Sequence, residues 1–380
     1  MNSLYIHIPF CRSKCPYCDF YSLRADGETV EAYVNALTDR LKNPGTLLPE
    51  GGLTLPGRLD TVYFGGGTPS VIGGENIAKI LDAAGKSFEI AGDAEITLEC
   101  NPSVCSGELL ETAAAAGVNR VSVGLQSAVD AERRALGRLA GRQEALAAVD
   151  NARAAGIDNI SLDLMLGIPG QTTESLDISL DFIIETGVPH VSDYMLQLEE
   201  GTVFWSRREK LDLPSDDTVS EMYLHTVDRL KNAGIIQYEI SNFARPGFES
   251  RHNMNYWLGG DYLGAGPAAH SFIGGKRFAF SRSVDAFING ERPEIYDSGG
   301  DAKEYIMLRL RLSEGIDFAE YEEKFRVQSS KFKGSFPGFM EKCRFYADRG
   351  LGELTDAGFR LTPRGFLVSN GIIADLIEFS

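Results

Sequence analysis

Short apolar runs alternate with helix-like segments along the chain up to about residue 245. The runs are rich in Val, Ile, Leu and Tyr, as strands are, and cover residues 4–9, 61–64, 95–98, 120–125, 160–166, 190–196 and 237–240. After the first run, Val34, Leu37 and Leu41 are three and four positions apart, on one helix face. Two further helices are expected to end at Gly117 and Gly156, because glycine readily adopts the conformation that follows a helix.

Strand–helix alternation predicts right-handed crossovers and a parallel sheet, hence an α/β fold. Six or seven units can form a partial or complete β/α barrel or a doubly wound sheet. Polar residues at the strand ends favour the barrel, which builds its sites there: Gly66, Thr68, Glu99, Gln126, Asp163, Gln197 and Asn242. Helix capping explains any one of them, but it is a weaker explanation for successive units. We therefore expect a β/α barrel, partial or complete, over residues 1–245.

The pattern changes after residue 245, where we expect a loop-rich connecting segment over 246–300 that contains many glycines and aromatic residues. Helical patterns then return at 303–311, 318–325 and 336–349, followed by a hairpin at 354–361 and a helix ending near Glu378. Helices followed by a small hairpin predict a separate, winged-helix-like C-terminal module over 301–380. Fold alone does not make it a DNA binder.

The net negative charge of the chain disfavours anionic partners such as nucleic acids and acidic membrane surfaces. The 380 residues include 37 Lys and Arg against 54 Asp and Glu, a net charge of −17, which repels phosphate backbones. We therefore expect no nucleic-acid partner, and membrane contact at most through a peripheral acceptor. No apolar run approaches the roughly 18 residues of a membrane span, and the N-terminus lacks a signal-peptide pattern. These features predict a cytoplasmic protein, and they are compatible with a homodimer.

The strongest chemical signal is a cysteine cluster after the first predicted strand. Cys11, Cys15 and Cys18 have the spacing C-x3-C-x2-C, which in a reducing compartment indicates metal rather than disulfides. Three thiolates can hold three irons of a [4Fe–4S] cluster, which leaves the fourth iron open to a small chelating ligand. The alternatives are a zinc site completed by His7 or Asp19, or three unrelated buried thiols.

This loop resembles the signature of the radical S-adenosylmethionine (SAM) superfamily. The resemblance implies a partial β/α barrel whose open iron is chelated by the amino and carboxylate groups of SAM. Electron transfer from the cluster then yields a 5′-deoxyadenosyl radical. The stretch 63–70, with Gly66, Gly67 and Thr68, is similar to the glycine motif of the family, where backbone carbonyls approach the SAM amino group. By itself such a glycine triplet is equally well explained as a turn.

Motifs further along the chain resemble the coproporphyrinogen III dehydrogenase branch of the superfamily and its close relatives, the HemW-type haem chaperones. The resemblance covers residues 4–260 and is looser in the C-terminal module. It implies that SAM is contacted by Tyr5, Gly66, Gly67, Thr68, Glu99, Gln126, Arg138 and Asp163, and we add Tyr17 of the cysteine loop as cofactor-binding. A carboxylate at Glu99 can accept two hydrogen bonds from a ribose diol. Individually, Arg138 could be a solvated helix charge and Asp163 a cap.

Three features favour the chaperone group over the dehydrogenases. Ten residues precede Cys11, too few for the N-terminal arm that the dehydrogenases carry over the tetrapyrrole. Phe20 occupies the position where the dehydrogenases have a fourth cysteine. Residues His252 to Trp257 fit the H-N-x-x-Y-W motif of the haem chaperones.

The same motif suggests a haem site. Neutral His252 is a suitable axial ligand for haem iron, and Tyr256 and Trp257 offer flat apolar faces. Propionate partners would be Arg245, Arg251 or Lys276, and the runner-up iron ligands are His7, His270, Cys105 and Cys343. Without the resemblance, a capping or surface histidine beside core aromatics is the simpler explanation.

We therefore expect a haem chaperone that binds a [4Fe–4S] cluster, SAM and haem, and that hands haem to an acceptor apoprotein. The alternative is an oxygen-independent coproporphyrinogen III dehydrogenase, which decarboxylates propionates oxidatively with a SAM-derived radical. A third hypothesis is a radical-SAM enzyme that acts on another tetrapyrrole.

Overall fold

The structure is a computed structural model that describes residues 1–325 and 337–378. Twelve strands form one sheet in the order β14-β13-β12-β11-β1-β4-β5-β6-β7-β8-β10-β9. Its central strands are parallel and confirm the first six predicted runs: β1 (Asn2–Ile8), β4 (Arg58–Gly66), β5 (Glu89–Cys100), β6 (Arg120–Gln126), β7 (Asn159–Leu166) and β8 (His190–Met195). The predicted α/β fold with a partial barrel is therefore confirmed.

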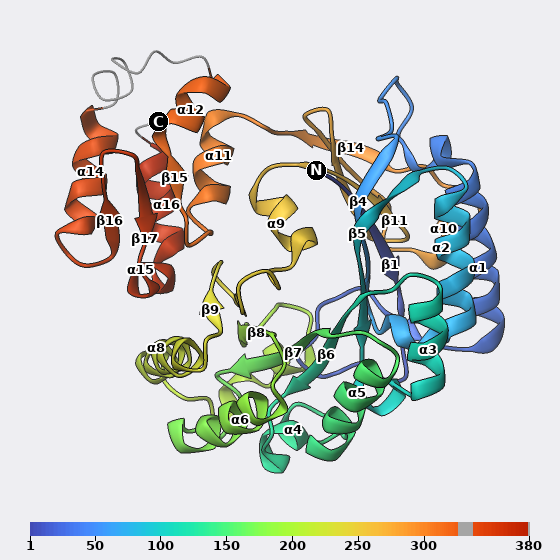
Figure 1. Ribbon diagram of the computed structural model, residues 1–380, viewed down its shortest axis with the longest axis horizontal. Helices are drawn as coiled ribbons and strands as arrows, with labels where there is room; N and C mark the ends of the chain where they lie inside the picture. The colour runs from blue at the N-terminus through green and yellow to red at the C-terminus, as the bar shows by residue number, and fades with distance from the viewer. Residues whose placement is uncertain (326–336, 379–380) are drawn as a thin grey trace.

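Helices cover the outer face of this sheet (Figure 1). They are α1 (Gly27–Lys42), α2 (Gly74–Gly85), α3 (Gly107–Ala115), α4 (Asp130–Ala135), α5 (Arg142–Ala154), α6 (Thr173–Thr186) and α8 (Asp216–Asn232). The short helix α7 (Val203–Ser206) instead contacts the cysteine loop, where the Phe204 amide donates to the Pro16 carbonyl at 2.9 Å. Val34, Leu37 and Leu41 of α1 are buried, as their spacing predicts. Gly117 and Gly156 follow α3 and α5 with φ of 113° and 83°, which confirms both predicted helix ends. Short 3-10 turns complete the connections: η1 (Pro44–Leu47), η2 (Pro69–Ile72), η3 (Pro102–Val104) and η4 (Arg208–Lys210).

The opposite, inner face of the sheet is polar. Along β6, Val121, Val123 and Leu125 pack into the core under the helices, whereas the alternate residues Arg120 and Ser122 are buried on the other side. The buried polar side chains of this inner face are Ser3, Thr61, Glu95, Thr97, Arg120, Ser122, Ser161, His190 and Ser192. The short helix α9 (Arg251–Trp257) packs against this face and lies within the curve of the sheet (Figure 1).

The seventh predicted strand, at 237–240, is wrong. The structure has two short strands there, β9 (Ile236–Gln237) and β10 (Asn242–Ala244), which pair antiparallel. The intervening residues turn the chain, because the Glu239 carboxylate accepts hydrogen bonds from the Ser241 amide and the Asn242 side chain. β10 also runs antiparallel to β8. Asn242 therefore begins a strand instead of following the carboxyl end of one.

The expectation of a loop-rich segment at 246–300 is also wrong. This segment contains α9, β11 (Asp261–Ala265), β12 (His270–Ile273), β13 (Lys276–Ala279), α10 (Val284–Ile288) and β14 (Glu294–Ser298). β11 pairs parallel with β1, and the following strands extend the same sheet. Closely spaced glycines such as Gly264 and Gly266 interrupt the apolar pattern, although Leu263, Phe272 and Phe278 are buried.

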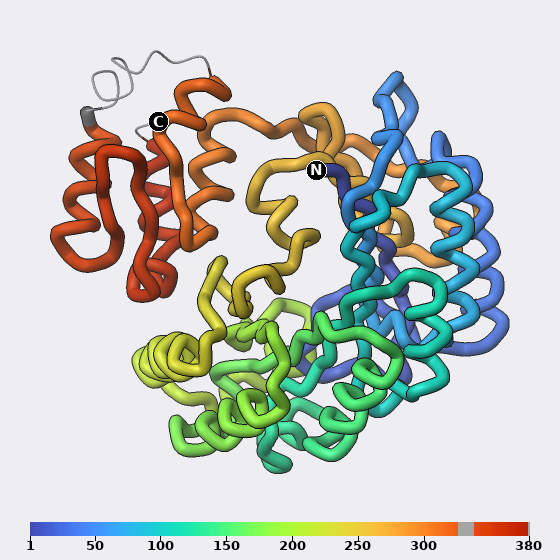
Figure 2. Tube along the Cα trace, viewed as in Figure 1, coloured from blue at the N-terminus to red at the C-terminus, as the bar shows by residue number. Residues whose placement is uncertain are grey.

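The remaining chain forms the predicted helical module with a hairpin. Its elements are α11 (Ala302–Arg309), β15 (Ile316–Asp317), α12 (Phe318–Phe325), α14 (Pro337–Ala347), β16 (Gly352–Leu354), β17 (Gly358–Leu361), α15 (Pro363–Leu367) and α16 (Ser369–Ile377). β15, β17 and β16 form a small antiparallel sheet. Residue 336, the expected start of one helix, lies outside the described residues. The module lies across from the N-terminal strands (Figure 2), and the division of the chain at 245 and 300 stays a prediction.

None of the helices in the two described ranges has the length and apolar character needed to cross a membrane.

A buried carboxyl group between β8 and α8 allows a prediction about stability. Asp193 is 2% exposed, both its carboxyl oxygens lack a hydrogen-bond partner among the described residues, and the Thr226 hydroxyl beside it is also unpartnered. Burial raises the pKa of Asp193 to about 7. The folded state therefore holds this proton more tightly than the unfolded state, so its contribution to stability falls as pH rises from about 4 to about 7.

Asp193→Asn should remove this loss. At pH 8 we expect the variant to be more stable than the wild type by about 1–2 kcal/mol, because the amide is uncharged but still lacks partners. The gain should shrink toward pH 5. Urea unfolding of both proteins at the two pH values measures it, and an equal gain at both would refute the assignment.

Candidate functional site

The three clustered cysteines lie on one loop at the carboxyl end of β1. The loop begins at β2 (Phe10–Cys11), which pairs with β3 (Leu23–Arg24), and the Cys18 amide donates to the Cys15 carbonyl at 3.2 Å. All three cysteines are free and half-buried. Within residues 1–325 and 337–378, no group of three His, Cys, Asp or Glu side chains could hold a single metal ion. This finding does not apply to an iron–sulfur cluster, because each thiolate then binds a different iron and the three sulfurs need not meet at one ion.

The glycine motif at the end of β4 packs directly on this loop. The Gly67 amide donates to the Ile8 carbonyl at 2.9 Å, and the Thr68 amide donates to the Phe10 carbonyl at 2.8 Å. A Cβ at Gly67 would lie 2.6 Å from the Phe10 carbonyl oxygen, so no larger residue fits without movement. Gly66 has φ of 112°, which other residues rarely adopt. The Thr68 hydroxyl lies 3.4 Å from Cys11 Sγ and connects the two motifs.

Glu99 extends from the end of β5 beside this motif. Its carboxylate accepts a 2.8 Å hydrogen bond from the Tyr63 hydroxyl, and the Tyr63 ring stacks on Tyr5 with centroids 6.2 Å apart. Withdrawal from water raises the pKa of Glu99 to about 7. Tyr5, Tyr63 and Glu99 are all half-buried, which leaves part of each side chain accessible.

Arg138 connects the cysteine loop to β6. Its guanidinium donates to the Tyr17 hydroxyl at 3.3 Å and to the Gly124 carbonyl at 2.8 Å. Arg138 lies after α4, is half-buried, and is therefore not a solvated helix charge. Gln126, at the end of β6, has φ of 68°, a strained conformation for a residue with a side chain. Such strain is common at functional sites.

Asp163 lies on β7, adjacent to this group. Its carboxylate accepts a 2.7 Å hydrogen bond from the Ser122 hydroxyl, and burial raises its pKa. It does not cap a helix, because Thr172 is the N-cap of α6. The sequence-predicted cysteines, the glycine motif, Glu99, Gln126, Arg138 and Asp163 thus occupy the carboxyl-end half of neighbouring strands and the loops that follow them. Gln197 follows β8, and within the described residues no hydrogen bond joins its side chain to this group.

His252 lies elsewhere, on the inner face near the amino ends of the strands. It is 1% exposed, with Nδ1 2.7 Å from the Thr61 hydroxyl and Nε2 2.9 Å from the Tyr256 hydroxyl. Its ring stacks on Tyr63 at a centroid distance of 4.9 Å. Burial lowers the pKa of His252 to about 3, so the imidazole is neutral. Both ring nitrogens are engaged, and a metal could bind Nε2 only by replacing the Tyr256 hydrogen bond.

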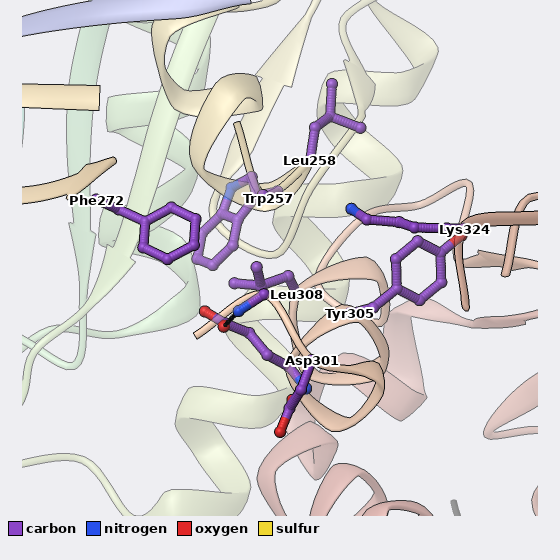
Figure 3. A pocket seen from close by; sticks show the side chains of 10 residues that line it. Trp257, Leu258, Phe272, Asp301, Tyr305, Leu308 and Lys324 are labelled. Atoms are coloured by element: carbon purple, nitrogen blue, oxygen red, sulfur yellow. Dashed lines mark hydrogen bonds between the residues drawn. The ribbon is translucent and has the colours of Figure 1, made fainter. Parts of the chain in front are cut away.

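The aromatic residues of the same motif face different neighbours. Tyr256 contacts His252 and Tyr262 edge to face, whereas Trp257 lines a small pocket with Phe272 and Tyr305 between the sheet and the C-terminal module (Figure 3). Even with the open solvent at its mouth, the pocket has a volume of only about 280 Å³, so it is too small to enclose a porphyrin in this conformation.

The runner-up histidines differ in accessibility. His7 is 5% exposed, and its two nitrogens lie near the Tyr5 hydroxyl and the Tyr21 carbonyl. His270 is exposed, and its Nδ1 lies 2.9 Å from the Tyr296 hydroxyl. His270 is thus the histidine that an added ligand reaches most easily.

Sequence reasoning missed the contacts that hold α9 in place. The Glu95 carboxylate accepts hydrogen bonds from the amides of Arg251 and His252, both at 2.9 Å. Thr61 bonds both Ser3 and His252. The sequence did contain a signal for these contacts. Along β1, β4 and β5, polar and apolar residues alternate, which places Ser3, Thr61 and Glu95 on one face of the sheet.

Comparison with known proteins agrees with this geometry. Residues 5–183 match the radical SAM superfamily, and residues 301–368 match the HemN C-terminal domain. The structure resembles the coproporphyrinogen III oxidase HemN from Escherichia coli, a radical SAM enzyme, with a TM-score of 0.83. The match covers 100% of this chain and 90% of that one, at 22% identity, and so describes the fold.

Curated relatives are more similar in sequence. The chain is 36% identical to the "Heme chaperone HemW" of Escherichia coli, over 90% of this chain and 93% of the relative. It is 34% identical to the protein of the same name from Bacillus subtilis, over 98% of both chains. The "Radical S-adenosyl methionine domain-containing protein 1, mitochondrial" of Bos taurus is 34% identical, over 99% and 87%. The chain therefore belongs to the radical SAM superfamily and, within it, to the HemW family.

Proposed function

We propose that this protein is a haem chaperone that binds haem and passes it to an acceptor apoprotein. One observation carries the proposal: relatives named "Heme chaperone HemW" are 32–36% identical over 90–98% of this chain. We place the protein in the cytoplasm, with haem and the acceptor as its partners and without nucleic acid. A homodimer stays compatible with this proposal.

Membership of the radical SAM superfamily implies a [4Fe–4S] cluster and SAM. The residues present fit both groups, because three free thiols on one half-buried loop adjoin a glycine cradle that a Cβ would fill. When bound, the cluster and SAM supply one-electron chemistry. We assign the cluster to Cys11, Cys15 and Cys18, and SAM to Tyr5, Tyr17, Gly66, Gly67, Thr68, Glu99, Gln126, Arg138 and Asp163.

The chain's own residues orient this site. The Tyr63 hydroxyl donates a hydrogen bond that orients the Glu99 carboxylate. The Tyr63 ring stacks on His252 and thereby connects the site to the inner face. Arg138 holds the cysteine loop against the end of β6 through Tyr17 and Gly124. The inferred roles are to fix the loop and to present a hydrogen-bond acceptor to a diol.

We retain His252 as the proposed iron ligand. A pKa of about 3 keeps the imidazole neutral at physiological pH, as iron binding requires. Nε2 would exchange its hydrogen bond to Tyr256 for the metal, and Nδ1 would keep its bond to Thr61. A hydrogen bond at the second nitrogen is the usual way in which proteins orient a ligand histidine.

Three variants test this assignment. His252→Ala should weaken haem binding by about tenfold or more and shift the Soret band, because the iron–nitrogen bond is lost. Tyr256→Phe should bind haem at least as tightly as the wild type, because it frees Nε2 and retains the ring. His270→Ala should behave like the wild type. Haem titrations followed by absorption measure all three. Identical affinity and spectrum in His252→Ala would refute the assignment, and loss of the band in His270→Ala would move it to His270.

A further inference from the structure

Arg120 is a buried cation whose Nε lacks a hydrogen-bond partner among the described residues. It begins β6 on the inner face, is 2% exposed, and is among the largest fully buried side chains. Within residues 1–325 and 337–378, its Nε is shielded from solvent and has no hydrogen-bond partner. The charge of Arg120 helps to lower the pKa values of the carboxyl groups of Glu99 and Asp163, which burial raises. Burying a guanidinium donor without an acceptor is unfavourable, so the unpartnered Nε indicates a missing hydrogen-bond acceptor.

Its neighbours on the adjacent strands also lack partners. Thr97 of β5 and Asn159 of β7 lie directly beside Arg120 in the sheet register. Thr97 Oγ1 and Asn159 Oδ1 are both buried without a hydrogen bond. A hydroxyl can donate, and the Asn159 amide can turn its nitrogen toward the same point, since oxygen and nitrogen are interchangeable by rotation. Three donors on neighbouring strands thus match one carboxylate.

Arg120 lies at the opposite end of β6 from the cysteine loop. Arg120 and Gln126 are the two ends of β6, about 20 Å apart at the rise of a strand. The cysteine loop lies at the Gln126 end, where Arg138 bridges Tyr17 and the Gly124 carbonyl. The Arg120 end instead contains His252, held by Thr61 and Glu95 of the neighbouring strands. The charge of Arg120 also helps to lower the pKa of both His252 and His190.

A neutral imidazole and a guanidinium with an unpartnered Nε on the same inner face are complementary to the iron and the carboxylates of one ligand. We propose that Arg120, with Thr97 and Asn159, binds a propionate carboxylate of haem at the inner face. This inference rests on the proposed function and adds the residues that recognise a propionate group of haem. Because Arg120 and His252 are 2% and 1% exposed, haem can enter only if α9 shifts from the sheet.

The cations suggested by sequence are placed differently. Arg251 donates to the Asp93 carbonyl and lies 3.8 Å from its carboxylate, and Lys276 donates to Ser298 at 3.0 Å. Arg245 is exposed. Arg120 differs from all three because it is buried and its Nε has no hydrogen-bond partner among the described residues.

The test compares haem with haem dimethyl ester, which keeps the iron and macrocycle but has no carboxylate. Both are titrated into the cluster-loaded wild type, Arg120→Gln, Arg120→Lys and the control Arg58→Gln, which changes an exposed arginine at the start of β4. The wild type and Arg58→Gln should bind haem at least about tenfold more tightly than the ester. Arg120→Gln should bind both equally, with ester affinity unchanged, and Arg120→Lys should keep part of the preference.

Several results would overturn the inference. Equal binding of haem and ester by the wild type would remove any role for a propionate. Arg120 would not be the group that recognises the carboxylate if Arg120→Gln still preferred haem to the ester. The same would follow if Arg120→Lys lost affinity for haem and for the ester equally. A fall in SAM affinity with an intact haem preference would assign the carboxylate to SAM. Failure of the wild type to bind either compound would contradict the proposed function itself, and this inference with it.

Discussion

Replacing any one of Cys11, Cys15 and Cys18 by alanine should abolish the iron–sulfur absorption band after anaerobic reconstitution. These three cysteines are free, half-buried and share one loop, so they can supply three thiolates to one cluster. With one thiolate removed, two irons lack a protein ligand, and no other cysteine belongs to this loop. Absorption spectra and iron content of each variant measure the loss.

The matched control changes the other three cysteines together. Cys100, Cys105 and Cys343 are buried, and burial raises the pKa of the Cys343 thiol, so it is a poor thiolate donor. The triple alanine variant should keep the full band. A cluster lost in this control, or kept in any single variant of the loop, would refute the assignment.

Glu99→Ala should lower SAM affinity by about ten- to a hundredfold. A hydrogen bond to a charged group is worth roughly 1.5–3 kcal/mol, and the variant removes the acceptor of a diol. The cluster should survive, because Glu99 lies outside the cysteine loop. Calorimetry on the reconstituted protein measures the affinity, and Glu89→Ala, an exposed carboxylate at the start of β5, is the control.

The same carboxylate predicts a pH dependence. Burial raises the pKa of Glu99 to about 7, so its charged form is lost as pH falls from 8 to 6. SAM affinity of the wild type should weaken over this interval, whereas Glu99→Gln should bind weakly at both values. An unchanged affinity in Glu99→Ala would remove Glu99 from the site.

Much of the barrel followed from local patterns. Strands whose apolar side packs under helices, such as β6, have a two-residue alternation that is visible in the sequence, and glycine marks the ends of α3 and α5. The strands of 261–298 were missed because they are four or five residues long and separated by glycines. The sequence predicted one strand in place of β9 and β10, because the turn between them depends on hydrogen bonds of Glu239.

The sequence predicted only those parts of the site that belong to short motifs with a characteristic residue spacing. The cysteines and the glycine motif meet as expected, because consecutive parallel strands end at one edge of the sheet. The surroundings of His252 were not predictable, because its partners Thr61 and Glu95 are more than 150 residues away. The lack of a hydrogen-bond partner for Arg120 Nε among the described residues is likewise a property of three adjacent strands.

Haem binding and coproporphyrinogen III turnover, measured on one preparation, distinguish a haem chaperone from a dehydrogenase. The anaerobically reconstituted protein, reduced in the presence of SAM, is divided between haem and coproporphyrinogen III. We expect a saturable Soret shift with haem, transfer of that haem to an added apoprotein, and no protoporphyrinogen IX from the second portion. Robust conversion of coproporphyrinogen III to protoporphyrinogen IX, without saturable haem binding, would contradict the chaperone function and support the dehydrogenase.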